Sequence, residues 1–416
     1  MDISIVGGGI GGLTLALMLH ATGRPCRVFE TAPEIRPVGV GINLLPHAMK
    51  ELAGLGLQPA LEARAVTTSA AAFYNRFGQL IYSEPLGRFA GYPWPQLSIH
   101  RADLQAVLVE AFVERIGADR LHLGHRAMGF EEDALGVRLH LQAATGASLP
   151  AHPADALIGA DGIHSAIRRQ LFPDEGPPRY SGVNMWRGVV SGARILNGST
   201  MIRAGWLATG KMVIYPIRNE PDGSGRQLIN WVAEIETPTY NRQDWTRAGR
   251  LEDFAHAFAD WHFDWLDVPA LLRGTREILE YPMVDRDPLP RWSFGRVTLL
   301  GDAAHPMVPR GSNGAGQAIL DARALADALA STPGEPVAAL ATYEAVRREA
   351  TSRVVLTNRS APPDAIIGEV YRRTGDKPFR HIDEVISREE LVALSDGYKK
   401  VAGYDKQALA ANNRES

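Results

Sequence analysis

Residues 1–30 read MDISIVGGGIGGLTLALMLHATGRPCRVFE and combine the local patterns of a strand, a glycine turn, a helix and a second strand that ends in an acid. In order, the segments are Ile3–Val6, Gly7–Gly12, Leu13–His20, Cys26–Phe29 and Glu30. This order is the fingerprint of a dinucleotide-binding βαβ unit. The sequence therefore predicts an α/β fold built on a parallel sheet.

The glycines of this turn have different physical reasons to be there. Gly7 allows the tight turn after the strand, and Gly12 lets the helix pack close to that strand. Gly9 has no Cβ that would block a pyrophosphate. We expect the phosphates to lie on the N–H groups at the start of the helix, next to Ile10 and Gly11.

Glu30 lies 23 residues after Gly7. A carboxylate at this place accepts hydrogen bonds from the hydroxyls of an adenosine ribose. The sequence therefore assigns Glu30 to the adenosine end of a bound dinucleotide.

The composition is that of an ordinary soluble globule, with 416 residues, 45% hydrophobic and 22% charged residues and a net charge of −3. This charge gives no basic footprint for nucleic acid. The single cysteine, Cys26, excludes an internal disulfide and a cysteine-rich metal site, and we expect no metal. No apolar run reaches about 18 residues, so we expect no membrane span. Because a strand begins at residue 3, we expect no signal peptide and a cytoplasmic location.

Two more buried strand patterns end in a glycine and an acid. Residues 156–160 lead into Asp161-Gly162, and residues 296–300 lead into Gly301-Asp302. Ligands of open α/β sheets collect beyond the carboxyl ends of the strands. One extended ligand that touches all three glycine sites is the simplest interpretation, and FAD fits because its ribitol needs an acid.

The middle of the chain has a different pattern. Strand-like runs dominate residues 183–236, and residues 73–83 have the pattern of a hairpin that turns at Gly78. We expect a mostly antiparallel sheet inserted into the α/β chain. Residues 251–272 have the pattern of a helix with Trp261 and Trp265 on one face, where packing is their expected role.

The motifs together resemble the single-component FAD-dependent aromatic monooxygenases of the 4-hydroxybenzoate and salicylate hydroxylase type, over about residues 1–360. The resemblance implies a Rossmann-like FAD-binding domain of the glutathione-reductase type, an inserted antiparallel substrate domain and C-terminal helices. The expected ranges are 1–72, 98–180 and 285–360 for the FAD-binding domain, 73–97 and 181–284 for the substrate-binding sheet domain, and 361–416 for the C-terminal helical segment.

The resemblance also assigns roles to single residues. Arg101, in His100-Arg101-Ala102-Asp103-Leu104, is similar to the family arginine that reaches the cofactor, and Asp161-Gly162 to the family's FAD/NAD(P)H motif. Asp302 would bind the ribitol. Pro309 and the following residues would pass beside the isoalloxazine ring. The full cofactor set is Gly7, Gly9, Ile10, Gly11, Gly12, Glu30, Gly41, Arg101, Asp161, Gly162, Asp302, Gly311, Asn313 and Gly314.

Four stretches resemble one branch of this family, the 5-methylphenazine-1-carboxylate 1-monooxygenases, which carry out an oxidative decarboxylation. These stretches are 36–43, 98–101, 185–189 and 281–290. The first contains Gly39 and Gly41, whose spacing indicates a backbone that runs close to something flat. We expect the last fifty residues to be charged and helical, with a frayed end at 407–416.

The resemblance implies that the flavin does the chemistry. FAD, reduced by NADH or NADPH as a transient co-substrate, would react with O₂ to a C4a-hydroperoxide that hydroxylates an aromatic ring, with loss of CO₂ where the attacked carbon bears a carboxylate. No catalytic side chain is certain, and the candidates near the flavin are Pro309, Asn313 and Gly314. Two alternatives stay open, a flavoprotein oxidase or dehydrogenase and a non-catalytic flavoprotein that binds aromatic ligands.

The expected substrate is a small aromatic carboxylate, bound by a monomer or homodimer with no nucleic-acid or membrane partner. Arg187 is either a partner of the substrate carboxylate or part of a structural ion pair. Tyr215 and Trp231 either line the pocket or fill the sheet, and His305 has a structural role. The full substrate set is Asn43, Leu45, Arg187, Tyr215, Trp231 and Pro309.

Overall fold

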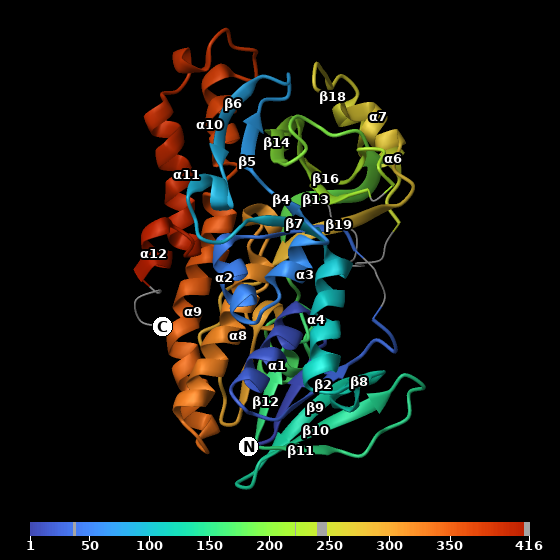
Figure 1. Ribbon diagram of the computed structural model, residues 1–416, viewed down its shortest axis with the longest axis vertical. Coiled ribbons are helices and arrows are strands. Elements are labelled where there is room, and N and C mark those ends of the chain that lie inside the picture. The colour runs from blue at the N-terminus through green and yellow to red at the C-terminus, as the bar shows by residue number, and fades with distance from the viewer. Residues whose placement is uncertain (36–38, 221, 239–247, 412–416) are drawn as a thin grey trace.

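The structure is a computed structural model that describes residues 1–35, 39–220, 222–238 and 248–411. Arg36, Pro37 and Val38, part of the branch resemblance, lie outside the described residues, as do residues 412–416 of the expected frayed end. In Figure 1 the N-terminal α/β part occupies the lower half and the large mixed sheet the upper half. None of the helices among the described residues is long and apolar enough to span a membrane.

A five-stranded parallel sheet forms the lower core, in the order β20-β12-β1-β2-β8. Its strands are β1 Ile3–Val6, β2 Cys26–Glu30, β8 Leu121–Leu123, β12 Ala156–Gly159 and β20 Val297–Leu299. The central strands β1 and β12 are buried along their whole length because helices cover the sheet, as is usual for parallel sheets. The helices of this half are α1 Ile10–Ala21, α2 Pro46–Gly54, α3 Gln58–Glu62, α4 Arg101–Arg115, α5 Ala166–Leu171, α8 Gly314–Ser331 and α9 Pro336–Ser360.

Two small sheets flank the parallel sheet. One consists of β9 His125–Glu132, β10 Val137–Ala143 and β11 His152–Ala154. The other consists of β3 Gly41–Leu44, β4 Val66–Thr67 and β7 Leu97–His100, and its strand β3 contacts the large sheet. The His100 side chain caps α4 by accepting a hydrogen bond from the Ala102 N–H, which explains why that helix begins there.

The large sheet has seven strands in the order β19-β13-β16-β15-β14-β5-β6. Its strands are β5 Ala70–Tyr74, β6 Leu80–Pro85, β13 Arg179–Gly192, β14 Thr200–Trp206, β15 Gly210–Asn219, β16 Gln227–Glu236 and β19 Ile278–Asp285. All neighbours are antiparallel except β14 and β5. This confirms the expected fold class, an α/β chain with an inserted, mostly antiparallel sheet.

The two faces of the large sheet bury different side chains, because neighbouring residues of a strand point to opposite sides. One face packs under α6 Leu251–Phe254 and α7 Val268–Arg273, in a cluster rich in tryptophan and phenylalanine. The opposite face carries a second cluster that includes Met185, Tyr215 and Met283, together with Val308 from the segment after β20. We call this second face the inner face.

The prediction of one helix over residues 251–272 is wrong. The chain forms the short helix α6, a hairpin of β17 His262–Phe263 and β18 Leu266–Asp267, and then α7. Trp261 and Trp265 therefore do not share a helix face. Both tryptophans still pack against aromatic side chains, Trp261 against Phe258 and Trp265 against Tyr74. Their spacing of four residues therefore reflects tertiary packing and not a shared helix.

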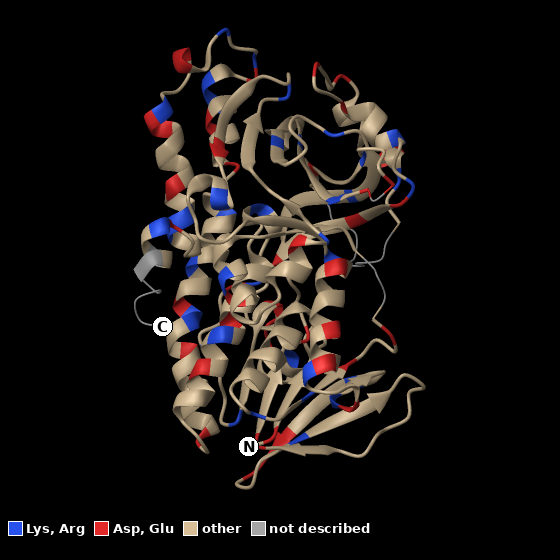
Figure 2. Ribbon diagram, in the orientation of Figure 1, with Lys and Arg blue, Asp and Glu red and all other residues tan. Residues whose placement is uncertain are grey.

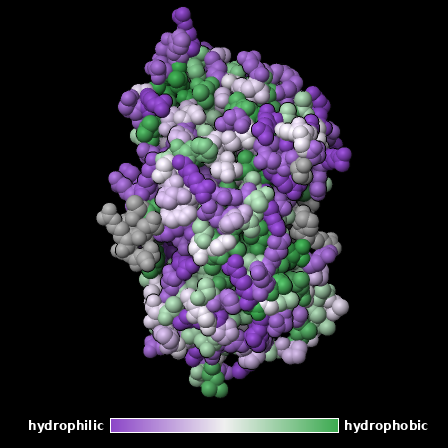
Figure 3. All heavy atoms as spheres, viewed as in Figure 1, coloured by the Kyte–Doolittle hydropathy of each residue, from purple (hydrophilic) through white to green (hydrophobic). Residues whose placement is uncertain are grey.

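The C-terminal segment lies beside the large sheet and reaches α9 near the middle of the molecule. It contains α10 Ala365–Thr374, α11 Arg388–Ala402 and α12 Lys406–Ala411 (Figure 1). Positively and negatively charged residues are interspersed along the ribbon (Figure 2), and apolar and polar residues are interspersed on the face that is shown in Figure 3.

Candidate active site

In the glycine turn after β1, the fold requires glycine at two positions but not at a third. A Cβ on Gly12 would lie 2.0 Å from the Gly7 carbonyl oxygen, and one on Gly7 would lie 2.3 Å from the Ala160 carbonyl oxygen. Gly7 also has a φ of +111°, which L side chains rarely adopt. A Cβ on Gly9, by contrast, would meet nothing within 4 Å. Gly7 and Gly12 thus build the turn, while Gly9 leaves room for a ligand.

Backbone hydrogen bonds hold the Glu30 carboxylate at the end of β2. Its two oxygens accept the N–H groups of Gly8 at 2.7 Å and Ala32 at 2.8 Å. A carboxylate has about four acceptor sites, so two remain for ribose hydroxyls. The residue is oriented beside the glycine turn as the βαβ fingerprint requires.

Asp302 lies beside the start of α8. It follows β20 and is accessible to solvent, and a Cβ on Gly314 would lie 4.0 Å from its Oδ1. Desolvation by the surrounding protein raises the pKa of Asp302, while electrostatic interactions with His305 and Arg101 act in the opposite direction. The fold thus brings Arg101 to the segment that carries Asp302 and Gly314, about 200 residues later in the sequence.

Asp161 leaves one acceptor unused. Its Oδ2 accepts the Ala166 N–H at 2.7 Å at the start of α5, and its buried Oδ1 has no hydrogen-bond partner among the described residues. Burial raises the pKa of this carboxyl. Gly162 follows with a φ of +76°.

These features fit FAD. The open space at Gly9, the oriented carboxylate of Glu30 and the accessible carboxylate of Asp302 suit a pyrophosphate, an adenosine ribose and a ribitol in that order. The first residues of α8 provide N–H groups that favour negative charge. When bound there, FAD supplies electron transfer and the activation of O₂.

The sequence model of a family described as "FAD binding domain" matches residues 1–358. The chain is 47% identical over 405 residues to phenazine 1,6-dicarboxylic acid hydroxylase PhzS of Lysobacter antibioticus, and the match covers 96% of this chain and 97% of that protein. The chain belongs to the FAD-dependent aromatic hydroxylases. It is thus an NAD(P)H-dependent flavin monooxygenase that acts on aromatic substrates with FAD and O₂.

Solved structures share this architecture. A salicylate hydroxylase in complex with its substrate superimposes with a TM-score of 0.73 at 26% identity and covers 97% of this chain and 96% of its own. Klebsiella pneumoniae HpxO in complex with FAD and uric acid gives a TM-score of 0.75 at 25% identity and covers 98% of this chain and 97% of its own.

Three predicted substrate residues meet on the inner face. Arg187 of β13 donates from Nη2 to the Gly41 carbonyl oxygen at 2.9 Å. Burial raises the pKa of Tyr215 on β15, while the charge of Arg187 and hydrogen bonds with Arg187 and Asn43 partly offset this rise. The side-chain oxygen of Asn43 also accepts the Ser98 hydroxyl at 2.7 Å.

Arg187 pairs with no carboxylate among the described residues. Its Nε is buried and has no acceptor within the part of the chain that the structure describes. The described residues therefore offer no carboxylate with which Arg187 could form a structural ion pair.

The structure corrects the assignment of Trp231 to the substrate site. Trp231 is fully buried on the opposite face of the sheet, where it packs against Phe254 and donates from Nε1 to the Thr275 hydroxyl at 2.8 Å. Because Ile214 and Trp231 are direct partners across β15 and β16, Trp231 cannot share a face with Tyr215.

Two predicted cofactor glycines also lie in close contact with other parts of the protein. A Cβ on Gly41 would meet Ile217 and Tyr215 at 2.7 Å, so the flat neighbour of Gly41 is the large sheet. A Cβ on Gly311 would lie 1.6 Å from the Tyr398 hydroxyl oxygen of α11. Both glycines permit contacts between layers of the protein, and their role at the cofactor stays a prediction.

Leu45 also faces the protein. It packs in a buried cluster with Tyr398, Ala402 and Tyr404, so its assignment to the substrate site is corrected to packing under the C-terminal segment. Pro309 remains accessible. His305 pairs with Asp321, which also binds Arg347, and this buried network agrees with the structural role expected for His305.

Asn313 precedes the first residue of α8. It is buried, and its Oδ1 lies 3.0 Å from His47 Nε2. Its Nδ2 has no partner among the described residues. The backbone of Asn313 and Gly314 stays a candidate for the flavin site.

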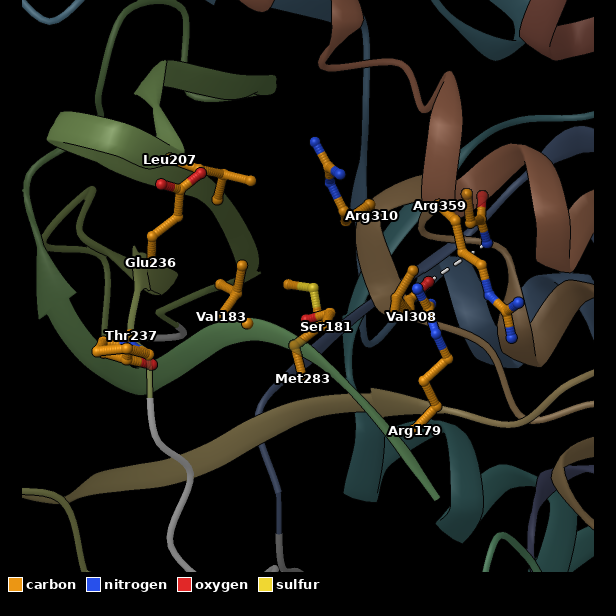
Figure 4. Close-up of a pocket in the computed structure, with 13 residues that line it drawn as sticks. Arg179, Ser181, Val183, Leu207, Glu236, Thr237, Met283, Val308, Arg310 and Arg359 are labelled. Carbon is orange, nitrogen blue, oxygen red and sulfur yellow. Dashed lines mark hydrogen bonds between the residues drawn. The ribbon is translucent and has the colours of Figure 1, made fainter. Parts of the chain in front are cut away.

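A cavity of about 490 Å³ opens at the end of the inner face (Figure 4). Apolar side chains of Val183, Leu207, Met283 and Val308 line it. Its charged residues are Arg179, Arg310 and Arg359, with Glu236 on the side of Leu207. None of the predicted substrate residues lines it, although Val308 and Arg310 flank Pro309. Every second residue of β13 points to the same face of the sheet, which places Val183, Met185 and Arg187 together. This alternation is the sequence pattern that could have indicated the lining of the cavity.

Proposed function

We propose that this flavin hydroxylase acts on a fused-ring aromatic carboxylate of the phenazine type. The observation that carries the proposal is Arg187, a half-buried cation without a described carboxylate partner on the apolar inner face. Guanidinium groups bind carboxylates through paired hydrogen bonds. The relative that acts on phenazine 1,6-dicarboxylic acid supports the same substrate class.

The side chains around Arg187 would orient the substrate rather than react with it. The Gly41 carbonyl oxygen and Tyr215 hold the guanidinium in place, and Asn43 in turn contacts Tyr215. Apolar neighbours such as Met185 and Met283 exclude water from the ring. Pro309, accessible in the turn before α8, would border the flavin ring and the substrate.

The stoichiometry of the proposed reaction follows from the substrate. When the hydroxylated carbon bears the carboxylate, one aromatic carboxylate, one NAD(P)H, one O₂ and two protons give a phenol, CO₂, NAD(P)⁺ and water. The aromatic carbon loses its bond to the carboxylate carbon and gains a bond to oxygen. When the carboxylate is on another carbon, a proton leaves instead and the carboxylate stays.

Assays of NADH and NADPH oxidation test the proposal. The purified yellow protein is given phenazine, salicylate and hydroxybenzoate carboxylates, and products and CO₂ are analysed. We expect the phenazine carboxylates to stimulate oxidation most and to yield a hydroxylated product. Stimulation by all rings alike, or peroxide as the sole product, would contradict the proposal.

A substitution tests the role of Arg187. We expect Arg187→Gln to raise the KM for the carboxylate roughly 30-fold or more, because a desolvated charge pair is worth about 2–3 kcal/mol. The exposed Arg138→Gln on β10 is the matched control. An unchanged KM would remove Arg187 from the substrate site.

A further inference from the structure

We propose that the cavity at the end of the inner face binds a second acidic group of the substrate, with Arg310 as its partner. The inference rests on the proposed aromatic carboxylate substrate, whose first carboxylate binds Arg187. The substrate class is therefore an aromatic ring system with an acid at each end.

Arg310 belongs to a buried charge cluster in which cations outnumber carboxylates. Lys211 lies 2.9 Å from Glu234 and 2.6 Å from Asp364. Asp364 also faces Arg203 at 3.5 Å and the Nε of Arg310 at 3.3 Å. Three cations thus share two carboxylates, so the cluster carries an excess positive charge.

Part of this excess charge reaches the cavity through Arg310. Its one described ion pair uses Nε, and its two terminal nitrogens have no acceptor among the described residues. In Figure 4 the side chain extends into the space between Leu207 and Arg359. An anion there would satisfy donors that the protein leaves free.

The other arginines of the cavity are less available. Arg359 already binds Asp285 at 2.6 Å, Asp287 at 2.7 Å and the Arg286 carbonyl oxygen at 3.0 Å. Arg179 is exposed and lies 4.0 Å from Asp285. Glu236 forms no ion pair with a described residue. Its negative charge would repel an acidic group of the ligand and so favour binding on the side of Arg310.

One apolar surface joins the two proposed anion sites. Val183, Met185, Val308 and Met283 belong to the same inner-face cluster as Tyr215 beside Arg187. Val183 is four residues from Arg187 on β13, a distance of about 13 Å. This apolar connection favours an aromatic acid over the phosphates of NAD(P)H.

Binding of paired ligands tests the inference. Dissociation constants are measured from the change in flavin absorbance for phenazine-1-carboxylate against phenazine-1,6-dicarboxylate, and for naphthalene-1-carboxylate against naphthalene-1,5-dicarboxylate. We expect the wild type to prefer the dicarboxylates at low salt. Arg310→Gln should weaken their binding about tenfold and that of the monocarboxylates less than about twofold. Arg310→Lys should restore most of the preference, and Arg138→Gln should change nothing.

Several results would overturn the inference. One is an equal loss of affinity for the dicarboxylate and the monocarboxylate in Arg310→Gln. Another is a wild type that binds both ligands of a pair equally well. A third is a variant in which the KM for NADH or NADPH rises while the binding of both ligands is unchanged. The wild-type preference and its loss at high salt decide the question even where Arg310→Gln does not fold. The naphthalene pair separates this inference from the proposed function, because an Arg310-dependent preference without hydroxylation of any phenazine would refute only the latter.

Discussion

Gly9 and Gly12 belong to the same glycine turn, but we expect their substitutions to fail in different ways. Gly12→Ala forces a Cβ against the Gly7 carbonyl and should lower the free energy of unfolding by about 1–3 kcal/mol, as overpacking does. In Gly9→Ala the added Cβ meets no protein atom, so the stability of the apoprotein should stay nearly unchanged. FAD binding should weaken because the Cβ occupies space that the pyrophosphate needs. Thermal unfolding of the apoprotein and FAD titration measure the two effects. FAD affinity equal to wild type in Gly9→Ala would contradict the cofactor role.

Two aspartates near the end of β20 also differ at the residue scale. Asp302 is accessible, so Asp302→Asn should weaken FAD binding roughly tenfold or more with little change in apoprotein stability. Asp321 is buried between His305 and Arg347, so Asp321→Asn should lower the free energy of unfolding by about 3 kcal/mol or more. Normal FAD content in Asp302→Asn would remove Asp302 from the ribitol site.

At the scale of elements, α2 carries a group that makes stability depend on pH. Burial lowers the pKa of His47 to about 4, with a smaller opposing effect of its hydrogen bond to Asn313. Between about pH 6.5 and pH 4 the unfolded chain therefore binds a proton that the folded chain does not bind. Stability from this group is present above pH 6.5 and is lost as the pH falls.

The expected loss between pH 7.5 and pH 4.5 is about 2–3 kcal/mol. Denaturant unfolding of the wild type and of His47→Gln measures it, because the variant should lose this part of the pH dependence. His20→Gln, at an exposed position of α1, is the control. Parallel pH curves for the wild type and His47→Gln would refute the prediction.

The contact between α11 and the segment before α8 is another property of elements. Gly311→Ala should destabilise the protein because its Cβ would lie 1.6 Å from the Tyr398 hydroxyl oxygen and 2.5 Å from Asn358 Oδ1. Adding Tyr398→Phe removes the first clash and should recover part of the lost melting temperature. Strictly additive effects of the two substitutions would show that the contact is not the cause.

At the scale of the molecule, Lys211 connects the large sheet to the C-terminal segment through Asp364. Lys211→Met leaves the buried carboxylate of Glu234 without its cation, removes the link to Asp364, and should cost about 3–5 kcal/mol. We expect faster hydrogen exchange in α10 than in β1. Arg372→Gln, which removes an exposed ion pair, should leave the free energy of unfolding nearly unchanged. Equal effects of the two variants would contradict this role of Lys211.

The cofactor end could be predicted because its signals are local. Gly7, Gly9, Gly12 and Glu30 lie within one βαβ unit, where spacing along the chain sets the geometry. The resemblance added Asp302, and the structure places it beside Gly314. The helix expected over residues 251–272 failed because a spacing of four residues also occurs in a packed hairpin.

The sequence by itself determined the α/β fold and the inserted sheet, since short-range spacing and strand patterns carry that information, and the resemblance of its motifs indicated the family. Only the tertiary structure decided which side of the large sheet each residue occupies. Strand alternation separates Tyr215 from Trp231 only once the register of β15 and β16 is known. Likewise, Gly41 and Gly311 differ from Gly9 only through the distant side chains that pack against them. The excess charge at Arg310 arises because folding gathers residues 203, 211, 234, 310 and 364, which no local pattern connects.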